Sequence, residues 1–142
     1  MAFLRAQDQQ AVRKEFERIQ GPVKLVVFSQ ELTAGELCRQ NEQLMREVAE
    51  LDARITVEVL NPSIDRERAE AYGVDQVPAI VVEGARDYGI RFLGIPSGYE
   101  FTNLIDSIIV ASSGEPDLTE ETRTALAGLA SEVDIKVFST PT

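Results

Sequence analysis

Residues 77–93 read VPAIVVEGARDYGIRFL and predict a β-hairpin. Pro78 opens a first run of strand-forming residues at 79–82, and a second strand is expected at 88–93. The residues between them include Gly84 and leave room only for a tight turn. Two strands joined by so short a link must be antiparallel, because a parallel pair needs a crossover of a dozen or more residues.

Helices and strands alternate before this hairpin. Apolar residues at 12, 16 and 19 have helical spacing and predict a helix over about 5–19. The run VKLVVFS at 23–29 is almost continuously apolar, as in a strand covered on both faces. Thr33 and Glu36 have the spacing of a capping box at the start of a second helix. Residues 54–60 then alternate as a strand, and residues 65–72 form a charged helix.

One more helix follows the hairpin, marked by apolar residues between 101 and 109. The first three strands are joined by helices and the last two by a turn, which predicts an α/β protein with a thioredoxin-like fold, a mixed sheet flanked by helices. We assign this domain to residues 1–113. Residues 114–142 are expected to hold a linker helix at about 118–130 and a strand at 135–139, because IKVFS there echoes KLVVFS at 24–29.

Composition excludes several classes of function. The chain of 142 residues carries 24 acidic and 14 basic side chains, and this net negative charge repels nucleic acids and anionic lipids. No apolar run is long enough to span a membrane. The absence of histidine removes the commonest metal ligand and the Ser-His and Cys-His dyads. We expect no metal site, and a single cysteine without a secretion signal indicates a reducing cytoplasm.

Five stretches together resemble one family: VKLVVFS at 23–29, LCRQNEQL at 37–44, YGVDQVPAI at 72–80, DYGIRFLGIPSGYEF at 87–101 and FSTPT at 138–142. They resemble the glutaredoxin-like protein disulfide oxidoreductases of thermophilic bacteria and archaea. That resemblance implies two thioredoxin-fold units in tandem, each with a Cys-x-x-Cys motif, that exchange dithiols with protein disulfides. It implies that residues 1–113 are the first, glutaredoxin-like unit and that 114–142 lead into a truncated second unit.

The family's attacking cysteine is missing from this chain. Gly35 stands in its place, and Cys38 matches the second, resolving cysteine. The resemblance also implies a cis bond before Pro78 and a binding role for the backbone of Val77, which would pair with extended polypeptide or glutathione. A lone Cys38 cannot close an intramolecular disulfide. We therefore expect no dithiol activity from the isolated chain.

Three functions stay open at this point. The leading one is a redox-silent module that binds polypeptide or glutathione at Gly35, Val77 and Pro78. The second is weak single-thiol exchange or glutathionylation through Cys38. The third is a structural unit that forms a homodimer through residues 135–139. The resemblance implies protein thiols or disulfides, or the second thioredoxin-like unit, as partners. No cofactor other than glutathione is expected.

Overall fold

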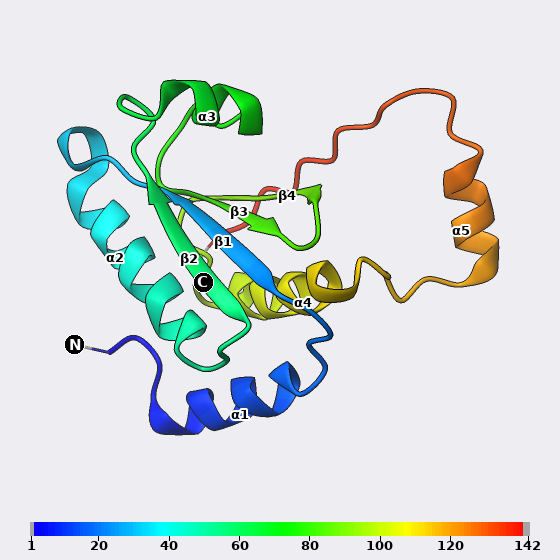
Figure 1. Ribbon diagram of the computed structural model, residues 1–142, viewed down its shortest axis with the longest axis horizontal. Coiled ribbons are helices and arrows are strands. Elements are labelled where there is room, and N and C mark those ends of the chain that lie inside the picture. The colour runs from blue at the N-terminus through cyan, green and yellow to red at the C-terminus, as the bar shows by residue number, and fades with distance from the viewer. Residues whose placement is uncertain (1, 141–142) are drawn as a thin grey trace.

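The computed structural model describes residues 2–140 (Figure 1). Residues 141 and 142, which end the FSTPT motif and the expected second-unit segment, lie outside the described residues. The elements follow in the order α1 (Ala6–Phe16), β1 (Val23–Phe28), α2 (Glu31–Ala49), β2 (Ile55–Leu60), α3 (Arg66–Tyr72), β3 (Ala79–Glu83), β4 (Asp87–Leu93), α4 (Tyr99–Ser113) and α5 (Glu120–Ala127).

The four strands form one mixed sheet in the order β2-β1-β3-β4. β1 is parallel to β2 and antiparallel to β3, and β3 is antiparallel to β4, so the predicted hairpin and the predicted fold class are confirmed. The register aligns one row of residues across the sheet: Leu60, Phe28, Ala79 and Leu93. The connections that follow β1, β2 and β4, and the one that precedes β3, therefore all meet at this end of the sheet.

Each face of the sheet carries its own core. The larger core packs α1, α2 and α4 against Val23, Leu25 and Val27 of β1. The smaller core lies under α3 and includes Val26 and Phe28. Successive residues of β1 thus enter different cores. This explains why the 23–29 stretch is almost continuously apolar instead of alternating.

The start of α2 differs from the prediction. The helix begins at Glu31, and its backbone leaves helical geometry at Ala34 (φ −148°, ψ 45°), so the long regular part starts at Gly35. The predicted capping box is wrong: the Thr33 hydroxyl donates to Oε1 of Gln30 at 3.1 Å, and Glu36 accepts from the Gln40 amide. An extra helical turn therefore separates β1 from the main helix.

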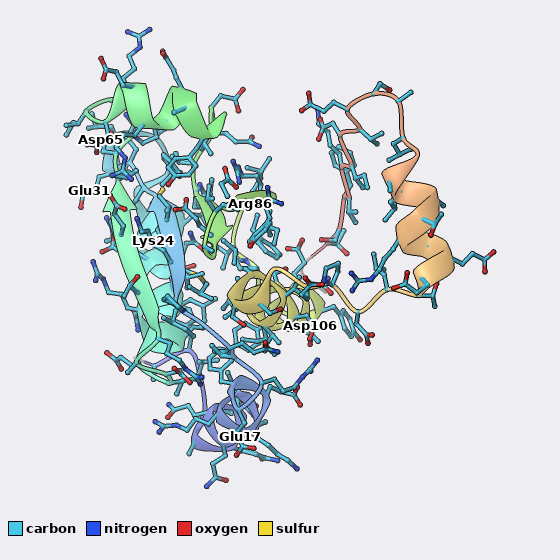
Figure 2. The ribbon with its side chains drawn as sticks, turned by 45° about the vertical axis from the view of Figure 1, so that its right-hand side comes forward. Glu17, Lys24, Glu31, Asp65, Arg86 and Asp106 are labelled. Atoms are coloured by element: carbon cyan, nitrogen blue, oxygen red, sulfur yellow. The ribbon has the colours of Figure 1, made fainter. Side chains whose placement is uncertain are left out.

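Helix α5 stands apart from the sheet and its helices, and the chain after it leads back toward the sheet (Figures 1 and 2). The linker helix α5 is shorter than predicted and buries no residue. Residues 129–140 form neither helix nor strand, so the predicted strand at 135–139 is absent from the single chain. Its apolar side chains Ile135, Val137 and Phe138 are 80–92% exposed. A strand needs a neighbour for its backbone hydrogen bonds, and within residues 2–140 this segment has none.

Candidate functional site

Val77 and Pro78 lie where the chain enters β3. Their peptide bond is cis, the isomer that the resemblance implied. Pro78 is buried, and its carbonyl accepts a hydrogen bond from Gly94 N–H at 2.8 Å. Val77 is half-buried against the smaller core, but its backbone N–H and carbonyl make no hydrogen bond within residues 2–140. Val77 lies in the bend just before β3 and presents an unpaired backbone N–H and carbonyl there.

The turn between β1 and α2 lies at the same end of the sheet as Val77 and Pro78. Because Ala79 pairs with Phe28, Pro78 is expected beside the residues that follow β1. Gln30, in that turn, donates its backbone N–H to Cys38 Sγ at 3.4 Å. Its side-chain amide donates to Ser63 Oγ at 2.6 Å, which ties the turn to the loop after β2.

Gly35 and Cys38 occupy successive turns of α2. Gly35 is the first residue after the distorted turn and is half-exposed. A Cβ built at Gly35 would meet only the Arg39 guanidinium Nη1 at 3.3 Å and the Glu31 Cβ at 4.0 Å. Since a guanidinium can shift by a few tenths of an ångström, the position has room for a side chain. Cys38 is one turn farther along the helix and is fully buried.

Five exposed apolar side chains surround this end of the sheet, and together we call them the apolar rim. They belong to the start of α2, the β2–α3 loop, the end of β4 and the start of α4: Leu32, Leu37, Ile64, Leu93 and Tyr99. Their exposed fractions range from 51% to 95%. Phe3 is the sixth large apolar side chain that is exposed within residues 2–113, so nearly all of that exposure is gathered here. A gathered apolar surface of this kind is typical of interaction sites.

The sequence interpretation missed the apolar rim. Its members lie near element boundaries, and a thioredoxin-like order of strands and helices brings these boundaries to one end of the sheet. That coincidence was the available signal.

Comparisons with known proteins identify the architecture. No protein-family model matches the chain, and no curated protein matches it. Among solved structures, the alkylhydroperoxide reductase AhpF of Enterococcus faecalis is 24% identical with a TM-score of 0.81, covering 89% of this chain and 61% of that one. A protein disulfide oxidoreductase from Aeropyrum pernix is 23% identical with a TM-score of 0.78, covering 91% and 56%. The chain has a thioredoxin fold. It spans about 60% of the length of these two structures.

The likeness confirms the predicted resemblance to thioredoxin-fold disulfide oxidoreductases at the level of the fold. A second structure of the Enterococcus faecalis protein, its N-terminal NTD_N/C domain, is 22% identical with a TM-score of 0.74, and covers 86% of this chain and 59% of that one. Sequence identities in this range establish architecture and leave activity to be argued from the residues themselves.

One polar side chain is buried without a partner in this thioredoxin fold. Asn41 is fully buried on α2, and neither its Oδ1 nor its Nδ2 forms a hydrogen bond. It is one turn beyond Cys38, on the helix face that also buries Met45. An unpaired buried amide lowers the stability of the fold. Like the apolar rim, Asn41 was not singled out in the sequence interpretation.

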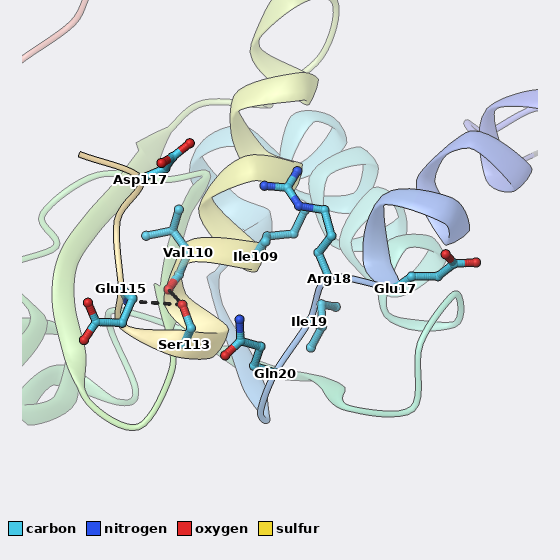
Figure 3. A pocket seen from close by; sticks show the side chains of 9 residues that line it. All are labelled: Glu17, Arg18, Ile19, Gln20, Ile109, Val110, Ser113, Glu115 and Asp117. Carbon is cyan, nitrogen blue, oxygen red and sulfur yellow. Dashed lines mark hydrogen bonds between the residues drawn. The ribbon is translucent and has the colours of Figure 1, made fainter. Parts of the chain in front are cut away.

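A hollow of about 370 Å³ lies elsewhere, between the end of α1 and the end of α4 (Figure 3). Glu17 and Arg18 line one side, and Ile109 and Ser113 line the other. Ser113 Oγ accepts a hydrogen bond from the backbone N–H of Glu115 where the chain leaves α4. Because α4 starts near the apolar rim and ends here, this hollow is separate from the Val77 site.

The residues described, 2–140, contain no group of three or more His, Cys, Asp or Glu side chains placed to hold a metal ion. No helix in this range has the length and apolar character needed to cross a membrane.

Proposed function

We propose that this thioredoxin-fold chain binds extended polypeptide and carries out no dithiol exchange itself. The observation that carries the proposal is the unpaired backbone of Val77, which lies at the same end of the sheet as the exposed apolar rim. An extended peptide can satisfy a free N–H and carbonyl by adding to a strand edge, while its side chains settle on nearby apolar surface. Both requirements are met at one end of this sheet.

The state of Gly35 and Cys38 supports the redox-silent part of the proposal. A nucleophilic thiol must be accessible and ionised, and the start of a helix favours its ionised form. Gly35 holds that position and has no thiol. Cys38 is fully buried and accepts a hydrogen bond from Gln30 N–H, so incoming disulfides have no open path to its sulfur. We therefore favour binding over single-thiol exchange or glutathionylation through Cys38.

The proposal is tested with the whole chain and a synthetic partner. ¹⁵N-labelled protein is titrated with an eight-residue extended peptide rich in Leu and Val, and amide shifts are followed by NMR. We expect the Val77 amide and its neighbours to move. A peptide N-methylated at the residue that pairs with Val77 should lose binding. The same modification one residue along should be tolerated, because alternate residues of a strand direct their backbone groups away from the partner.

The proposal fails if both N-methylated peptides bind equally, or if the shifts cluster away from residues 76–79. Glutathione is titrated in parallel as the smaller candidate ligand. Shifts at Val77 from glutathione alone would replace polypeptide by glutathione as the ligand.

A structural, oligomerising role is the second candidate, and one observation favours it. Ile135, Val137 and Phe138 are exposed and unpaired in the single chain, and such segments add to the sheet edges of other molecules. We expect sedimentation to give a dimer for the full chain and a monomer after residues 134–142 are deleted. Equal masses for both would remove this candidate.

A further inference from the structure

We infer that the polypeptide bound at Val77 carries apolar side chains flanked by lysine or arginine. This inference rests on the proposed function and adds the chemistry of the ligand. It follows from two groups of side chains at the same end of the sheet: the apolar rim, and a set of acidic side chains that form no ion pair within residues 2–140.

The apolar rim sets the first requirement. Leu32 and Ile64 are 95% and 80% exposed, and Tyr99 is 83% exposed, so each has nearly its whole side chain available to a ligand. Covering apolar surface contributes about 25 cal/mol for each Å² removed from water. The three side chains belong to α2, the β2–α3 loop and α4, which meet at the same end of the sheet as Val77. A ligand that contacts more than one of them must extend across the edge.

Acidic side chains set the second requirement. Four carboxylates flank the same edge: Glu31 and Glu36 on the first turns of α2, Asp75 two residues before Val77, and Glu100 in the first turn of α4. Figure 2 shows Glu31 at the end of the sheet near α3, next to Asp65. No ion pair within residues 2–140 involves any of these four carboxylates.

Their charges are therefore left for a ligand. Arg39 is the exposed base beside Gly35, and Arg66, at the start of α3, already pairs with Glu70, so acids outnumber the available bases around the edge. Other carboxylates in this region are already engaged: Asp65 accepts the backbone N–H of Asn61, and Glu70 pairs with Arg66. The local field favours a cationic ligand and disfavours glutathione, whose net charge is negative.

The size of the effect follows from exposure. An exposed ion pair contributes about 0.2–1 kcal/mol, which corresponds to a factor of roughly 1.4–5 in affinity. Two basic residues on the peptide should therefore strengthen binding by roughly tenfold over two acidic ones at low salt. Screening shortens the reach of exposed charges to about 8 Å at 0.15 M salt, so the preference must shrink as salt is added.

The experiment compares three peptides of equal length on the whole chain by calorimetry at 20 mM and 300 mM salt. The first has Leu and Val flanked by two lysines, the second replaces the lysines with glutamate, and the third keeps the lysines but replaces Leu and Val with serine. We expect the first to bind tightest, the second roughly tenfold more weakly at low salt, and the third not at all. The gap between the first two should close at high salt.

Protein variants assign the effect to the residues. The double variant Glu31→Gln and Asp75→Asn should weaken the lysine peptide severalfold and leave the glutamate peptide unchanged or tighter. Glu121→Gln removes one exposed acid on α5, away from the site, and should change neither. Ile64→Ser should weaken both apolar peptides.

The outcomes separate the two proposals when each peptide is also titrated by NMR. Equal affinity for the lysine and glutamate peptides, with amide shifts at Val77, overturns the charge preference alone. Equal affinity for the serine peptide overturns the role of the apolar rim. Absence of shifts at residues 76–79 with every peptide overturns the proposed function itself.

Discussion

Gly35→Cys should convert this chain into a dithiol that closes a disulfide with Cys38. The two residues are three apart on a regular stretch of α2, where helical geometry puts their Cα atoms about 5 Å apart. That separation lies inside the range of about 4.4–6.8 Å that disulfides adopt. Little stands in the way of the new side chain, because its Cβ would meet only the mobile end of Arg39 at 3.3 Å.

The same surroundings should make the introduced thiol reactive. A helix N-terminus stabilises a negative charge by about 0.3–1 kcal/mol, and a guanidinium at about 4 Å in water adds about 1 kcal/mol. Together they favour the thiolate by roughly tenfold over a free cysteine at pH 7 and lower the pKa of the new thiol. The fold should tolerate the change or gain about 0.4–1 kcal/mol, since replacing glycine restricts the unfolded chain.

The assay is a thiol count with intact mass after equilibration with oxidised glutathione, followed by insulin reduction in the presence of dithiothreitol. We expect the variant to lose two hydrogens, to show no free thiol when oxidised, and to reduce insulin faster than the parent chain. Gly35→Ser controls for the side chain without sulfur. Gly35→Cys combined with Cys38→Ser controls for the missing resolving thiol, and both should stay at the parent rate. A folded variant that keeps two free thiols would refute the assignment of Gly35 to the nucleophile position.

Three further predictions concern stability, each measured as the free energy of unfolding in urea. Gly84→Ala should destabilise the fold by about 3 kcal/mol, because a Cβ there would lie 1.9 Å from a backbone carbonyl of α4. Gly73→Ala is the control: its Cβ would meet no neighbour, so it should cost about 1 kcal/mol for its positive φ alone. Equal losses for the two variants would contradict the steric explanation. Asn41→Leu should stabilise by about 1–2 kcal/mol by removing two unpaired polar atoms, and a loss instead would mean that the amide has a partner. The hydrogen bond from Arg91 lowers the pKa of Asp87 below its ordinary 3.8, so this carboxylate stabilises the fold above that pH and loses its effect as the pH falls through its lowered pKa. Asp87→Asn should therefore cost about 0.2–1 kcal/mol at pH 7, and this cost should shrink as the pH falls below 3.8, whereas a cost that stays constant as the pH falls would contradict the linkage.

The sequence predicted those parts of the fold in which local pattern and tertiary packing agree. The run at 23–29 is apolar at nearly every position because its residues fill two cores, and the short turn at Gly84 permits only an antiparallel pair. The capping box failed because Gln30 takes the Thr33 hydroxyl, a contact that depends on how β1 enters the helix. The strand at 135–139 was absent for a different reason, since strand propensity without a neighbouring strand forms no ladder.

The sequence likewise predicted some residues of the candidate site and missed others. Gly35, Val77 and Pro78 could be named from motif positions, and the strand register brings their segments to one end of the sheet. The apolar rim was not named, because apolar residues near the ends of helices and strands look like ordinary core residues until their neighbours are known. Asn41 was hidden by the reverse effect: a single polar residue on an amphipathic helix suggests solvent exposure, yet the side chain is fully buried.

The thiol chemistry and the proposed polypeptide binding depend on different groups of atoms. Thiol exchange depends on one atom, the sulfur at the helix start, and Gly35 lacks it while leaving room for a side chain at that position. The proposed polypeptide binding depends on a backbone edge at Val77, on apolar side chains from α2, α4 and the β2–α3 loop, and on carboxylates that form no ion pair. Glu31 is exposed, and its Cβ would lie 4.0 Å from a Cβ at Gly35, an ordinary van der Waals contact. A chain of this kind can therefore lose reactivity while its recognition surface stays intact, and restoring one sulfur should restore chemistry without changing which peptides bind.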